Sequence, residues 1–212
     1  MGVTIHYRGR LRTPELIDPL IREVTDIARS MSWECQSFDE VILSGDEELS
    51  AQYLNFWRPA GWTSVRLRGL FVTPHPRSES LRFLFDPEGR LIDFLDLKFG
   101  EPPFEELSWI FTKTQFAGPE VHVAVVGLLK YLKKKYFDVF EVNDEGTYWK
   151  TGNLETLTER MGFLDRKINE FADALENTPR VRGETIGDMV DRIEAVLRGL
   201  MEKGPGAPDE EE

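Results

Sequence analysis

The chain is poor in the residues that build metal sites, disulfides and phosphate-binding loops. Its 212 residues include one cysteine, Cys35, and three histidines, His6, His75 and His122. A single cysteine excludes an internal disulfide, and no two histidines stand at a spacing typical of metal ligands. Glycine-rich phosphate motifs and the Gly-x-Ser-x-Gly motif of hydrolases are absent from the sequence. We therefore expect no bound metal and no cofactor.

Long hydrophobic runs and an excess of positive charge are also lacking. No apolar stretch approaches the roughly 20 residues that cross a bilayer, so we expect no membrane partner. The formal net charge is −12, of which residues 204–212 contribute −4, and this balance disfavours long-range attraction to nucleic acid. The N-terminus enters a strand-like stretch at once, without a charged-then-apolar leader. Together with the single cysteine, this start favours a cytoplasmic location.

The clearest pattern that is present lies in the last third of the chain. Two apolar stripes predict a helical hairpin over residues 153–203, because each apolar edge needs a partner. The first stripe follows alternating steps of three and four, through Leu154, Leu157, Met161, Leu164, Ile168, Phe171 and Leu175, and the second runs from Ile186 to Met201. Packing within the chain is favoured, and a homodimer through these helices is the alternative. Residues 204–212, rich in glycine, proline and acid, are expected to form a disordered tail.

Residues 1–152 carry a mixture of strand and helix patterns. Strands are expected at 3–11, 38–43, 65–73, 81–85 and 109–115, and helices at 14–32 and 119–137. A turn at 86–89 predicts a returning strand over 90–97, and residues 139–143 and 147–150 predict a closing hairpin. This order lacks the regular strand–helix alternation of a parallel sheet. We predict an α+β domain over 1–152, with a mainly antiparallel sheet, helices packed on one face, and the helical hairpin following it.

Arginines recur at two-residue spacing in two of the predicted strands. Arg8 and Arg10 share one face of the first strand, and Arg66 and Arg68 share a face of another. If these strands lie close together, the guanidinium groups would form a surface that binds carboxylate or phosphate. Pairing with the chain's own carboxylates, such as Glu141, is the simpler interpretation and is favoured. The arginines remain candidate ligand-binding residues.

Polar and aromatic residues are also mixed around the start of the predicted helix 119–137. Trp109 and Gln115 are candidate ligand contacts, because a strand end that leads into a helix N-terminus can bind an anion. Lys113, Glu120 and His122 are weak candidates for acid–base catalysis if a pocket opens there. Ordinary helix-start chemistry after Gly118-Pro119 explains the same residues and is favoured.

The sequence contains no recognisable catalytic constellation, and this shapes the functional hypotheses. The leading one is a non-catalytic interaction or regulatory protein that binds a protein partner or a small anionic ligand. The alternative is an enzyme or small-molecule sensor with a pocket between the sheet and the helix 119–137. Nucleic-acid binding through an arginine-lined sheet face is a second alternative, which the acidic total makes unlikely.

Overall fold

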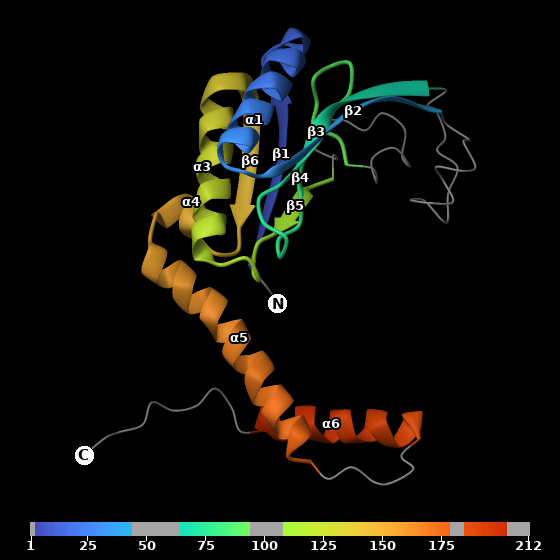
Figure 1. Cartoon of the computed structure of the whole chain (residues 1–212), viewed down its shortest axis with the longest axis vertical. Coiled ribbons are helices and arrows are strands. Elements are labelled where there is room, and N and C mark those ends of the chain that lie inside the picture. The colour runs from blue at the N-terminus through green and yellow to red at the C-terminus, as the bar shows by residue number, and fades with distance from the viewer. Residues whose placement is uncertain (1–2, 44–63, 94–107, 179–184, 203–212) are drawn as a thin grey trace. The chain divides into compact units, whose positions relative to one another are not determined.

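A computed structural model describes residues 3–43, 64–93, 108–178 and 185–202 of the chain (Figure 1). The chain divides into two compact units, Met1–Met161 and Gly162–Glu212, which are described separately here. None of the helices in these described ranges combines the length and the apolar character needed to cross a membrane.

The described residues of the first unit form six strands and several helices. In chain order its elements are β1 (Thr4–Leu11), a short 3-10 helix (Pro14–Leu16), α1 (Ile17–Ser30), β2 (Glu34–Leu43), β3 (Ser64–Thr73), β4 (Leu81–Phe85), β5 (Ile110–Lys113), α3 (Pro119–Tyr136), β6 (Phe137–Asp144), α4 (Tyr148–Thr151) and the start of α5 (Leu154–Glu176). The strands form two three-stranded sheets of order β5-β1-β6 and β2-β3-β4, with antiparallel pairing throughout. The predicted α+β fold class is confirmed.

Two amphipathic helices enclose the main core against the strands. The buried face of α1 consists of Ile17, Leu20, Val24 and Ala28, which repeat at helical spacing. α3 is apolar around much of its first half and buries Val125, Val126, Leu128, Leu129 and Leu132. α1 contacts β2 and β3, whereas α3 contacts β6, so each sheet carries one helix, and Figure 1 shows the two helices side by side. Both sheets contribute to one apolar cluster beneath them.

Two of the expected strands differ from the prediction in their described residues. The segment 90–93 makes only isolated bridges, Arg10 to Arg90 and Phe85 to Leu91. The chain turns at Asp86, whose carboxylate accepts hydrogen bonds from the backbone N–H groups of Glu88 and Arg90. It then crosses to β1, where Leu91 N donates to Gly9 O at 2.9 Å. The remainder of the predicted returning strand, 94–97, lies outside the described residues.

The predicted closing hairpin is wrong in its second half. Residues 148–151 form the short helix α4 instead of a strand. The cause is the Asp144 carboxylate, which accepts hydrogen bonds from the backbone N–H groups of Gly146 and Trp149, both at 2.7 Å. These bonds curl the chain directly after β6, and Thr147 takes a left-handed conformation with φ of 63°.

A polar cluster joins α1 to α3 near the surface. The Glu23 carboxylate accepts two hydrogen bonds from the Lys135 ammonium, at 2.6 and 2.7 Å, and one each from the hydroxyls of Tyr131 and Tyr136. Burial raises the pKa of Glu23, but the hydrogen bonds from Lys135 and the two tyrosines outweigh it and lower the pKa to about 2. The charged form of Glu23 is therefore stabilised by the fold.

Glu23→Gln is expected to lower the free energy of unfolding at neutral pH by about 1–3 kcal/mol. The pKa of Glu23 is depressed in the folded state, so its stabilisation is complete above the unfolded value of about 4.3 and is lost as the pH falls toward about 2. The difference in free energy of unfolding between wild type and variant should therefore shrink as the pH falls from about 4.3 to about 2. Urea unfolding of both proteins at a series of pH values measures it, and a difference that stays constant with pH would contradict this account.

The second unit contains the end of α5 and the helix α6 (Ile186–Glu202). Arg192 of α6 donates a hydrogen bond to the backbone oxygen of Leu175 near the end of α5, at 3.2 Å. Phe171 and Leu175 of α5 and Ile193 and Val196 of α6 are half-buried. A pair of C-terminal helices is thus present, as the two apolar stripes predict. At its other end α5 begins with an Asn153 cap, whose side-chain oxygen accepts a hydrogen bond from Thr156 N at 3.1 Å.

Candidate functional site

The sheet β5-β1-β6 has one face that packs against the core and one that does not. On β1, Ile5 and Tyr7 are buried, whereas His6 and Arg8 lie half-buried and Arg10 is exposed on the opposite face. The register places His6 opposite Phe111 of β5 and opposite Asn143 of β6. The side chains that alternate outward on these strands therefore form one continuous outer face.

Aromatic rings and cations lie against one another on this outer face and at its margins, where Arg82 comes from β4 and Phe116 follows β5. The Arg8 guanidinium lies 4.8 Å from the ring centroid of Trp109, that of Arg82 lies 5.1 Å from Phe111, and the Lys113 ammonium lies 5.3 Å from Phe116. The ring centroids of His6 and Phe111 are 6.3 Å apart. We call this set the aromatic–cation face; its members are His6, Arg8, Arg82, Trp109, Phe111, Lys113 and Phe116.

The three apolar rings of the aromatic–cation face remain substantially open to solvent. Trp109 is 37% exposed, Phe111 42% and Phe116 38%. Large aromatic side chains gain much free energy when they are buried, and a cation above one ring face contributes only about 0.5–1 kcal/mol at an exposed site. The rings therefore retain apolar surface that a bound partner could cover.

The arginines of this region are paired with carboxylates. Arg8 contacts Glu141 at 2.8 Å, Arg10 contacts Asp138 at 2.9 Å, and Arg82 contacts Asp93 at 3.1 Å. Each guanidinium charge is thereby balanced by a neighbouring carboxylate, as the simpler interpretation of the arginine spacing expects.

The other two arginines of the predicted cluster lie in the second sheet. Arg66 of β3 forms a bidentate pair with Asp39 of β2, at 2.7 and 2.8 Å, diagonally across a register in which Arg66 itself faces Val41. Arg68 pairs with Asp18 of α1 and lies 3.8 Å from Asp39. The hydrogen bond from Arg66 holds the pKa of the Asp39 carboxyl below its usual value. Arg66 and Arg68 therefore form a separate charged group from Arg8 and Arg10.

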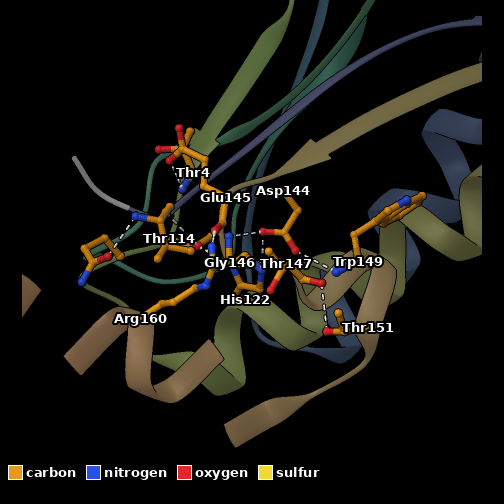
Figure 2. A network of polar contacts seen from close by, with 12 residues as sticks. Thr4, Thr114, His122, Asp144, Glu145, Gly146, Thr147, Trp149, Thr151 and Arg160 are labelled. Carbon is orange, nitrogen blue, oxygen red and sulfur yellow. Dashed lines mark hydrogen bonds and ion pairs between the residues drawn. The ribbon is translucent and has the colours of Figure 1, made fainter. Parts of the chain in front are cut away.

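A buried polar network joins the ends of β5 and β6 to the start of α3 (Figure 2). His122 is fully buried; its Nδ1 lies 2.7 Å from the Thr114 hydroxyl, and its Nε2 lies 3.2 Å from an Asp144 oxygen. Burial raises the pKa of Asp144, but His122 and the backbone N–H groups of Trp149 and Gly146 lower it by more, so the net pKa is below the ordinary value. Asp144 is thus held as a carboxylate inside the protein.

Hydroxyl, imidazole and carboxylate groups in a row can activate a nucleophile when substrate reaches them. Here Thr114 and His122 are both 0% exposed, and the Thr114 oxygen also lies 3.4 Å from the backbone oxygen of Val3. The network binds its own members and the N-terminal strand. The side chains of Thr114 and His122 are therefore closed off from solvent by the fold.

The other sequence candidates lie in differing surroundings. Gln115 is buried, with its amide oxygen accepting from Val3 N and its amide nitrogen donating to Met161 O, both at 2.9 Å. Glu120 is exposed at the start of α3, and Lys113 is half-buried beside Phe116. His122 is enclosed by Thr114 and Asp144. The three acid–base candidates therefore do not share a common surface.

Sequence reasoning missed Phe111 and Phe116 as members of the site. Phe111 stands two residues from both Trp109 and Lys113, so the alternation of a strand already places these three side chains on one face. Phe116 follows β5 and offers no such signal. Arg8, Trp109 and Lys113, which the sequence singles out, do come together on the aromatic–cation face.

Among the residues that the structure describes, no group of three or more histidine, cysteine, aspartate or glutamate side chains is arranged to hold a metal ion. Comparison with protein-family models, with curated proteins and with solved structures found no match. The functional argument therefore depends on the geometry of the chain itself.

Proposed function

We propose that this chain is a non-catalytic interaction protein that binds a partner protein through the aromatic–cation face. The observation that carries the proposal is the solvent exposure of Trp109, Phe111 and Phe116 in the aromatic–cation face, each with a cation against its ring. Tryptophan, other aromatics and arginine are the residues most enriched at the energetic centres of protein interfaces.

The charges of this face favour a protein partner over a free anion. Arg8 and Arg82 already contact Glu141 and Asp93, so an incoming phosphate or carboxylate would have to compete with these pairs. A partner protein gains instead from covering the rings while the charged pairs remain at the rim. The net charge of −12 also disfavours nucleic acid.

Trp109→Ala combined with Phe111→Ala is expected to abolish capture of the partner. The two truncations remove two of the three apolar rings of the face, and hot-spot truncations of this kind cost about 2 kcal/mol or more each. Wild type and the double variant are used as baits in lysates of the native cells. Quantitative mass spectrometry of the retained proteins then measures the loss of the partner.

The matched control for that comparison is Met31→Ala combined with Val41→Ala. These two apolar residues are 48% and 54% exposed elsewhere on the first unit. A protein retained by wild type and control but lost with the double aromatic variant supports the proposal. Retention that is equal for all three baits would refute it.

The helix α6 supplies a second contact, for which we expect another copy of the chain. Ile186, Val190 and Leu197 recur at helical spacing along α6 and are 82%, 47% and 45% exposed, whereas Ile193 within the same stripe is half-buried. Two such stripes laid antiparallel would place Val190 of each copy opposite Leu197 of the other. An interface of this kind is self-complementary and closes as a dimer.

Val190→Glu combined with Leu197→Glu is expected to convert a dimer into a monomer, because two charges would have to be buried at the interface. Light scattering gives the mass of both proteins. Ala195→Glu, on an exposed part of the same helix, should leave the dimer intact. A wild-type protein that is already monomeric at high concentration would exclude this contact.

A further inference from the structure

A second positively charged surface lies on α3 of the first unit. Its lysines differ from the arginines described above in whether they have carboxylate partners. In the described part of the chain, no carboxylate lies within ion-pair distance of Lys130, Lys133 or Lys134 of α3. The arginines Arg8, Arg10, Arg66 and Arg82 all have such partners. The positive charge of these lysines is therefore not neutralised by the described residues.

Trp149 brings two of these lysines together. The ammonium groups of Lys130 and Lys133 lie 5.5 and 5.7 Å from the centroid of its ring. The ring packs against the main core, and the Trp149 backbone N–H donates to Asp144 at 2.7 Å. The indole is therefore held in place, and the two ammonium groups converge on a fixed point.

Stabilisation of the helix end explains only part of this arrangement. Lysines in the last turn of a helix complement its dipole, and Lys133 and Lys134 fall in the last turn of α3, which ends at Tyr136. Lys130 lies more than a turn before that end, where the effect of the dipole has faded. Two like charges held near one ring repel each other, and a bound dianion would remove that repulsion.

We propose that Lys130, Lys133, Lys134 and Trp149 form a site for compact, multiply charged phosphate groups. Lysine carries a compact point charge and is a common phosphate ligand, and the arginines Arg8, Arg10, Arg66 and Arg82 are already paired with carboxylates of the chain. A short ligand fits best, because charges more than about 10 Å away are screened, whereas a long polyanion would also meet the acidic remainder of the chain. The site lies apart from the aromatic–cation face and does not depend on the function proposed for it.

The test is calorimetric titration of the full chain with sodium tripolyphosphate at low ionic strength. Wild type is expected to bind, and Lys130→Gln combined with Lys133→Gln is expected to weaken binding at least about tenfold, which equals about 1.4 kcal/mol. The matched control, Arg22→Gln combined with Arg77→Gln, removes the same charge from two other exposed positions and should change the affinity less than about twofold. All four side chains are exposed, so the melting temperatures of both double variants are expected to equal that of wild type.

Vesicle sedimentation identifies the source of the phosphate. Lysine-dependent binding to phosphatidylcholine vesicles that contain a phosphoinositide, together with tripolyphosphate binding, supports the site with a lipid headgroup as its ligand. Binding of tripolyphosphate alone supports a soluble phosphate compound. The proposal is overturned if neither probe binds, if both double variants weaken binding equally, or if single-stranded RNA binds more tightly than tripolyphosphate with the same dependence on the lysines.

Discussion

Asp144→Ala is expected to lower the free energy of unfolding by about 2–4 kcal/mol, because each hydrogen-bond donor left without an acceptor inside a protein costs about 1–3 kcal/mol. The Asp144 carboxylate faces His122 Nε2 at 3.2 Å and accepts hydrogen bonds from Gly146 N and Trp149 N at 2.7 Å. Alanine would leave the backbone N–H groups of Gly146 and Trp149 without their acceptor. It would also release the chain between β6 and α4, where Trp149 packs on the core.

Urea unfolding monitored by circular dichroism measures that loss. Asp138→Ala is the matched control, because Asp138 is an exposed carboxylate of the same strand that pairs with Arg10 on the surface. Its removal should cost about 0–1 kcal/mol. Equal unfolding midpoints for the two variants would show that the buried network contributes no more to stability than the exposed Arg10–Asp138 pair.

Gly69→Ala is expected to destabilise the protein by about 3 kcal/mol or more, at the upper end of overpacking effects. A β-carbon at Gly69 would lie 1.8 Å from the backbone oxygen of Phe83 and 2.9 Å from the Cα atom of Leu84. Gly69 stands opposite Leu84 in the β3–β4 register. The contacts are with backbone, so no change of side-chain rotamer relieves them, and the two strands would have to separate.

Gly127→Ala serves as the control, because it is expected to raise the free energy of unfolding. Gly127 lies in the middle of α3, and a β-carbon there would meet no atom within 4 Å. Alanine in a helix interior is favoured over glycine by about 0.5–1 kcal/mol, so this variant should melt above wild type. If both alanine variants unfolded like wild type, the close approach of β3 and β4 at Gly69 would be disproved.

The sequence predicts a strand or a helix correctly where its apolar residues follow a single clear periodicity. β1, α1 and α3 follow residues that alternate or repeat at helical spacing, and these patterns report which face is buried. The segment after Asp86 and the segment after Asp144 could not be read in this way. In both, a buried carboxylate binds backbone N–H groups and redirects the chain, and sequence spacing does not reveal which aspartates are buried.

The candidate site was predictable in part for a related reason. Strand alternation places Arg8 and Arg10 on one face of β1, but it does not say which strands are neighbours. The separation of Arg66 and Arg68 into the second sheet, and the meeting of Arg8 with Trp109, depend on strand order. The burial of His122 likewise depends on Thr114 and Asp144, which belong to different segments of the chain.

Photo-crosslinking in the native cells tests the central claim, that the aromatic–cation face binds a protein, most directly. A photoreactive amino acid at position 111 is expected to form discrete adducts that are destroyed by protease, resist nuclease, and are lost when Trp109→Ala is added. The same amino acid at position 31 should give none of these adducts. Adducts at position 111 that nuclease removes, or the same adducts at both positions, would contradict the account.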